Sequence, residues 1–85
     1  MLIEWLLPDD AIAAIRAAEA KKTPFYGFDG AFIHEKTVQL SLADSWDYSG
    51  GTSWPAVEDP YRHAVQFIQE RANEGLRFEL VFADG

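Results

Sequence analysis

The chain has 85 residues, 48% of them hydrophobic, and its 14 acidic against 7 basic residues give a formal net charge of -7. A chain of this length can bury one hydrophobic core, which excludes a second domain and predicts a single compact α+β domain over residues 1–85. Phosphate backbones are bound mainly by Lys and Arg, so the acidic balance argues against direct binding of nucleic acid and favours a basic protein partner.

Cysteine is absent, which excludes disulfides, thiolate catalysis and cysteine-based metal sites. The first residues, "MLIEWLL", differ from a signal peptide because they lack a basic residue, contain Glu4 and stop at Pro8. No apolar run approaches the roughly 18 residues of a membrane-spanning helix. We therefore expect a cytoplasmic protein that contacts no membrane.

The first two predicted elements are a strand and a helix. Residues 2–7 are apolar except for Glu4, which predicts a strand in a mostly apolar environment. Residues 8–22 start with a proline and two aspartates and end with two lysines, an arrangement that complements the dipole of a helix. The apolar side of this helix consists of Ala11, Ile12, Ile15 and Ala18, with Ala14 beside it.

A hairpin is predicted next, within residues 23–44. The Asp-Gly pair at 29–30 and the Glu-Lys pair at 35–36 are its two candidate turns. In "TVQLSL" apolar and polar residues alternate, so we expect a strand with three side chains facing the core, Val38, Leu40 and Leu42. The strand that pairs with it is formed by residues 25–28 or by residues 31–34.

A second helix and a last strand complete the chain. Asp59 is the expected N-cap, Pro60 the first helical residue and Gly75 the stop signal. The expected buried side of this helix comprises Tyr61, Ala64, Val65, Ile68 and Ala72, with Phe67 at its border. The segment "LRFELVFA" predicts a strand with one apolar side, which consists of Leu76, Phe78, Leu80 and Phe82.

The resulting βαββαβ order resembles the ferredoxin-like fold, a two-layer sandwich in which two helices cover one face of an antiparallel sheet. Known uses of that fold fit this chain poorly. RNA-recognition motifs stack bases on aromatic side chains of the open sheet face, whereas the outward positions of the third strand are Thr37, Gln39 and Ser41. Acylphosphatase-like enzymes hold phosphate with an arginine after the first strand, where this chain has two aspartates.

Catalysis, a cofactor and a metal site are not expected. The segment "SGGTS" offers hydroxyls and backbone amides, but it lacks the lysine that a phosphate-binding loop carries. His34 and His63 stand alone, without further residues at the spacing of a metal site. The calcium-loop spacing of an EF-hand is also missing.

The most unusual segment is an acidic, aromatic stretch at about residues 43–59, which has the composition of a long loop and contains no Lys or Arg. Tyr, Trp, Ser and Gly are the residues that binding loops favour, and carboxylates steer a loop toward a basic surface. We expect Trp46 and Tyr48 to be exposed, while Trp54 is expected to pack against the core. The candidate protein-binding residues are Asp44, Trp46, Asp47, Tyr48, Trp54 and Glu58.

These features favour a non-catalytic acidic module that occupies a basic site on another protein, such as a nucleic-acid-binding site, and thereby inhibits it. Inhibitors encoded by phages and mobile elements, including anti-CRISPR proteins, are similar in size and charge, although no motif carries a family resemblance. An immunity protein or antitoxin against a basic toxin is one alternative. A ligand-binding or enzymatic ferredoxin-like domain is another, and a homodimer remains open.

Overall fold

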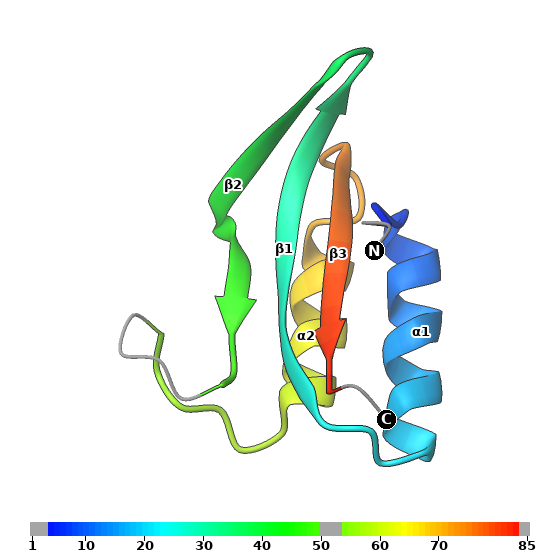
Figure 1. Cartoon of the computed structure of the whole chain (residues 1–85), viewed down its shortest axis with the longest axis vertical. Helices are drawn as coiled ribbons and strands as arrows, with labels where there is room; N and C mark the ends of the chain where they lie inside the picture. The colour runs from blue at the N-terminus through cyan, green and yellow to red at the C-terminus, as the bar shows by residue number, and fades with distance from the viewer. Residues whose placement is uncertain (1–3, 50–53, 84–85) are drawn as a thin grey trace.

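The computed structural model of the chain describes residues 4–49 and 54–83. In chain order its elements are α1 (Pro8–Ala20), β1 (Phe25–His34), β2 (Thr37–Asp47), α2 (Pro60–Glu70) and β3 (Leu76–Phe82). The strands form one antiparallel sheet in the order β2-β1-β3, and both helices lie against the same face of it (Figure 1). The chain therefore has the α+β architecture that the sequence predicts. We call the opposite face of the sheet the uncovered face.

Both predicted helices are present, and local chemistry explains where they begin. Pro8 is at the start of α1, with two aspartates in its first turn. The Asp59 carboxylate caps α2 by accepting a hydrogen bond of 3.1 Å from the Arg62 N–H, which confirms the predicted N-cap. Neither of these helices, the two within the described part of the chain, is long and apolar enough to cross a membrane.

The core lies between the helices and the covered face of the sheet. On that face the register places Phe28 opposite Leu80 and Phe32 opposite Leu76, which confirms the predicted alternation of the last strand. Alanines on both helices are fully buried, so the helices can approach each other closely. The largest fully buried side chains are Phe28, Phe78, Ile15, Ile68 and Leu76.

The order of elements differs from the ferredoxin-like prediction. Among the described residues the order is αββαβ rather than βαββαβ. Leu6 exchanges two backbone hydrogen bonds of 2.8 Å with Phe78, at the edge of β3 away from β1. Pro8 starts α1 directly after Leu7, which limits the pairing at this end, and residues 2 and 3 lie outside the described part. The ferredoxin-like topology is therefore not matched.

The prediction that β2 turns its apolar side chains toward the core is wrong. Val38, Leu40 and Leu42 are 48%, 66% and 77% exposed. Val38 pairs with Ile33, and Leu40 pairs with Ala31, so these side chains lie on the uncovered face. Both helices lie on the other face of the sheet and so cannot cover these side chains, and the β1–β2 hairpin also extends beyond the ends of both helices (Figure 1).

The hairpin itself settles which residues pair. Its turn is at residues 35–36, the second of the two candidate positions, and residues 29–30 lie inside β1. Both candidate partner ranges, 25–28 and 31–34, therefore belong to a single ten-residue strand.

Candidate functional site

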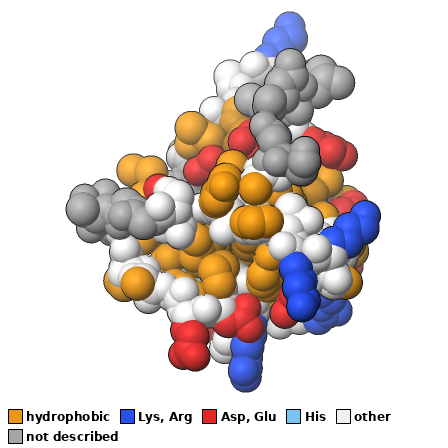
Figure 2. Space-filling model, turned by 60° about the horizontal axis from the view of Figure 1, so that its bottom comes forward, with side chains coloured by type: hydrophobic (Ala, Val, Ile, Leu, Met, Phe, Trp, Pro, Cys, Tyr) orange, Lys and Arg blue, Asp and Glu red, His pale blue; other side chains and the backbone are white. Residues whose placement is uncertain are grey.

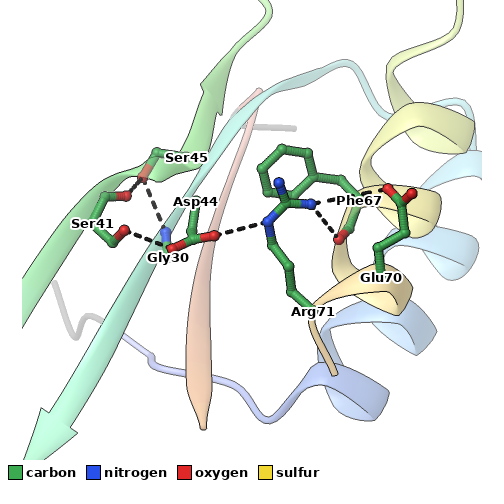
Figure 3. Close-up of polar contacts among 7 residues, drawn as sticks. All are labelled: Gly30, Ser41, Asp44, Ser45, Phe67, Glu70 and Arg71. Carbon is green, nitrogen blue, oxygen red and sulfur yellow. Dashed lines mark hydrogen bonds and ion pairs between the residues drawn. The ribbon is translucent and has the colours of Figure 1, made fainter. Parts of the chain in front are cut away.

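A large bulge in β2 determines how the aromatic segment meets the sheet. Ser41 pairs with Gly30 and Trp46 pairs with Phe28, so residues 42–45 stand opposite a single residue of β1. The buried Ser45 holds this bulge in place, because its Oγ donates to the Ser41 carbonyl at 2.7 Å and accepts from the Gly30 N–H at 3.1 Å (Figure 3).

The bulge turns Asp44 toward α2. Arg71 Nε donates to Asp44 Oδ1 at 2.8 Å, and Ser41 Oγ donates to Asp44 Oδ2 at 2.6 Å (Figure 3). The Arg71 guanidinium also lies over the Phe67 ring, 3.5 Å from its centre. Asp44 thus joins β2 to α2 in an internal ion pair, and its charge is largely balanced within the chain.

Trp46 and Tyr48 also face inward, so the expectation that they are exposed is wrong. The Trp46 ring lies 4.5 Å from the His63 ring, and the Tyr48 ring lies 5.3 Å from the Phe25 ring, measured between ring centres. Both aromatic residues pack against the hydrophobic core. The strand continues to Asp47, and the bulge places Trp46 on the covered face beside Phe28. These two rings therefore close the side of the core beside α2.

The Tyr48–His63 contact is a hydrogen bond between two neutral groups. Their Oη and Nδ1 atoms are 2.6 Å apart. Burial raises the pKa of Tyr48, while burial and the charge of Arg71 lower the pKa of His63. At neutral pH both side chains are therefore uncharged, and the hydrogen bond between them joins the end of β2 to α2.

This contact predicts a loss of stability in mild acid. The unfolded chain binds a proton at His63 near pH 6.5, whereas the folded chain binds it only at lower pH. The free energy of unfolding should therefore fall as the pH drops through 6.5 toward the folded value. Urea unfolding at about pH 7.5 and about pH 5.5 measures this change. His63→Asn, which keeps an acceptor but does not titrate, should show a smaller difference between the two; an equal difference would contradict the assignment.

A concavity with a volume of about 670 Å³ opens on the uncovered face. We call it the acidic hollow; its wall includes Tyr26, Asp29, Asp47, Trp54 and Val81. The register places three of them on the uncovered face, because Asp47 and Val81 both pair with the backbone of residue 27, and Asp29 pairs with residue 79. None of the described residues that line it is Lys or Arg.

The charges at the hollow are negative and only partly compensated. The Ser49 hydroxyl and the Ser49 N–H both donate to Asp47 Oδ1, which lowers the pKa of Asp47 and keeps it ionised. Asp29 of β1 pairs with Glu79 of the neighbouring strand β3, so the two residues lie side by side on the same face. Burial and the charge of Asp29 raise the pKa of Glu79. The uncovered face near the hollow therefore favours a positive charge.

Removing one of these opposed carboxylates should stabilise the chain. Like charges on paired residues of neighbouring strands destabilise a sheet. Glu79→Gln should therefore raise the free energy of unfolding at about pH 7 by up to about 1 kcal/mol. Glu79 ionises less readily in the folded chain, so the gain should disappear when the pH falls below 4.5. Denaturant midpoints at both pH values test this, and a gain that persists in acid would contradict the electrostatic cause.

The structure does not bring the six predicted binding residues together at one site. Asp47 and Trp54 line the acidic hollow, and Glu58 is exposed before α2. Asp44, Trp46 and Tyr48 face α2 or the core, and Trp46 also contributes to the wall of the hollow. Figure 2 views the end of the molecule that is at the bottom of Figure 1, where hydrophobic side chains reach the surface and charged ones surround them.

The sequence did not indicate the contributions of β1 and β3 to the hollow. Tyr26 and Asp29 belong to β1, and Val81 belongs to β3. Tyr26 is the extra residue where the β1–β3 register shifts, and it is 46% exposed. The aromatic and acidic residue types were a signal, but only the register shows that they share a face.

No family model matches the chain, and no curated protein matches it significantly. Within residues 4–49 and 54–83, no three His, Asp or Glu side chains lie close enough together to hold a metal ion.

Proposed function

We propose that the chain is a non-catalytic, acidic protein-binding module whose acidic hollow receives a basic side chain of another protein. The observation that supports this proposal is the lining of the hollow, which combines aromatic and acidic residues and, among the described residues, includes no Lys or Arg. The proposal keeps the acidic, aromatic binding site that the sequence suggests. It transfers that site from the predicted loop at about residues 43–59 to the uncovered face of the sheet.

An arginine or lysine side chain fits the chemistry of this wall. Asp29 and Asp47 supply opposite charge, and the Asp47 carboxylate is held ionised by Ser49. Tyr26 and Trp54 supply aromatic rings over which a cation is stabilised by about 0.5–2 kcal/mol. A guanidinium group uses both features at once, because it is planar, always charged and able to donate to a carboxylate with two N–H groups.

The class of partner follows from the charge. A chain with a net charge of -7 associates fastest with a basic surface, and many basic surfaces bind nucleic acid. We place the module in the cytoplasm as an inhibitor that occupies such a site, in the manner of anti-defence proteins encoded by phages. Neutralisation of a basic toxin by an immunity protein or antitoxin uses the same chemistry.

A second candidate function is supported by the size of the hollow. Its volume of about 670 Å³ lies within the range of small-molecule sites, about 300–1,000 Å³. A small organic cation would meet the same rings and carboxylates as a basic side chain. In that case binding would need no partner protein.

The experiment that tests the proposal is affinity purification from host lysate with two variants of equal charge. Asp29→Asn/Asp47→Asn removes both carboxylates of the hollow. The matched control, Glu19→Gln/Glu74→Gln, removes two exposed carboxylates on α1 and after α2. Wild type and control should recover the same basic protein, and recovery should fall as salt is raised. The hollow variant should lose it.

Two results would overturn the proposal. Equal recovery by all three proteins would show that the hollow is not the interface. Recovery of no basic protein by the wild type would remove the protein-binding function, and calorimetric binding of a small organic cation to the wild type but not the hollow variant would then establish the second candidate.

A further inference from the structure

The outer edge of β2 is a second exposed feature, separate from the acidic hollow. β2 is the last strand of the described sheet on its side, with β1 as its one neighbour. Its residues 37–43, "TVQLSLA", contain no charged residue and no proline. Edge strands of natural proteins commonly carry charged residues or prolines, which prevent another strand from pairing with them. This edge lacks that protection.

The backbone of this edge is oriented for pairing. Residues 34 and 37 flank a two-residue turn and face each other as a hydrogen-bonded pair. Because the direction of backbone groups alternates along a strand, the N–H and C=O groups of residues 39 and 41 also point toward β1. Those of Val38 and Leu40 point outward, and the side chains of Val38, Leu40 and Leu42 are all exposed.

Charge indicates what would pair with this edge. The chain as a whole carries a net charge of -7 and repels a second copy over most of its surface. The edge of β2 is neutral, because Glu35 and Lys36 balance each other at one end and Arg71 balances Asp44 at the other. A basic partner finds no carboxylate along residues 37–43, whereas an identical neutral, apolar edge is complementary to it.

We propose that two copies of the chain pair through β2 in antiparallel orientation, with the twofold axis at Leu40. This register places Leu40 opposite Leu40 of the second copy and Val38 opposite Leu42 of the second copy. Each of the three exposed apolar residues then has an exposed apolar counterpart. A shift by one residue would pair outward groups with inward ones, and larger shifts would leave apolar side chains unmatched.

Edge pairing also fits better than stacking of the two uncovered faces. Stacking would bring Asp29, Asp47 and Glu79 of both copies together, whereas edge pairing keeps these carboxylates apart. The pairing is closed at two copies because it uses the same edge of each. At the opposite edge of the sheet, the backbone N–H and C=O groups of Phe78 in β3 are already hydrogen-bonded to Leu6. The result is a continuous six-stranded sheet with all four helices on one face.

Sedimentation equilibrium of the wild type and two charged variants tests this proposal. Leu40→Glu and Leu40→Lys each place like charges opposite each other at the twofold axis, so each variant alone should be a monomer. An equimolar mixture should form a dimer, since Glu then faces Lys. Because the Leu40 side chain is mostly exposed, both variants should remain folded, and their unfolding temperatures should fall only by the contribution of the lost dimer. Leu7→Glu, at another exposed leucine, should dimerise as the wild type does.

The wild type should sediment as a dimer at micromolar concentration. A wild-type monomer under these conditions would overturn the proposal, as would a dimer that Leu40→Glu leaves unchanged. Dimers that both variants lose but their mixture does not restore would show that Leu40 residues do not face each other, and the proposed register would then be wrong. Binding of a basic partner at the hollow is measured separately, so either proposal can fail without the other.

Discussion

Replacing Phe28 with alanine is expected to lower the free energy of unfolding by about 3–5 kcal/mol. The Phe28 ring is 2% exposed, and it contacts rings from both sides of the core, with centre distances of 5.1 Å to Phe67 and 6.0 Å to Phe78. The substitution leaves a cavity that these rings cannot fill. A chain of this size has a total stability of roughly 4–13 kcal/mol, so the loss is a large fraction of it. Denaturant unfolding monitored by circular dichroism measures the effect.

The matched control for this change is Tyr26→Ala, two residues earlier in the same strand. Tyr26 is about half exposed and lines the acidic hollow, so its loss should cost less than about 1 kcal/mol. It should instead weaken binding of the basic partner. Similar stability losses for Phe28→Ala and Tyr26→Ala would contradict the assignment of these neighbours to opposite faces of the sheet.

Gly30→Ala is the second substitution expected to have a large effect. A Cβ atom at Gly30 would lie 2.4 Å from the Asp44 carbonyl oxygen and 2.8 Å from the Asp44 Cβ. The β2 bulge cannot accept this atom without moving, and movement disturbs both the Ser45 hydrogen bonds and the ion pair with Arg71. We expect a loss of about 1–3 kcal/mol or more.

Thermal unfolding of Gly30→Ala beside Gly75→Asn tests this explanation. Gly75 has a positive φ of 78°, but no atom lies within 4 Å of the position of its Cβ, and asparagine tolerates positive φ better than most residues. Gly75→Asn should therefore have a small effect. If Gly30→Ala unfolds at the wild-type temperature, the bulge is not packed as tightly as the structure indicates.

Local signals predicted the helices well because the determining contacts are close in sequence. The N-cap at Asp59 and the buried residues of α1 follow from the spacing of a few neighbouring residues. The alternation of β3 was also correct, since its apolar side meets the core along its length. In each case the sequence pattern and the tertiary environment favour the same structure.

The errors in β2 have a different physical cause. Alternation showed that Val38, Leu40 and Leu42 share a face, but a strand pattern does not reveal whether a helix covers that face. The bulge then reversed the expectation for Trp46 and Tyr48, because four residues opposite one change which side chains point inward. Predicting the candidate site required this register, since its residues come from three strands and the segment before α2.

The measurement that tests the binding account most directly is an NMR titration of the chain with a short peptide of arginine and glycine. We predict that the largest shifts occur at the amides of Tyr26, Asp29 and Asp47 and at the indole of Trp54. A peptide with glutamine in place of arginine should produce no such shifts, and Asp29→Asn/Asp47→Asn should abolish them. Shifts centred on the helices, or shifts at the hollow that persist in this variant, would contradict the account.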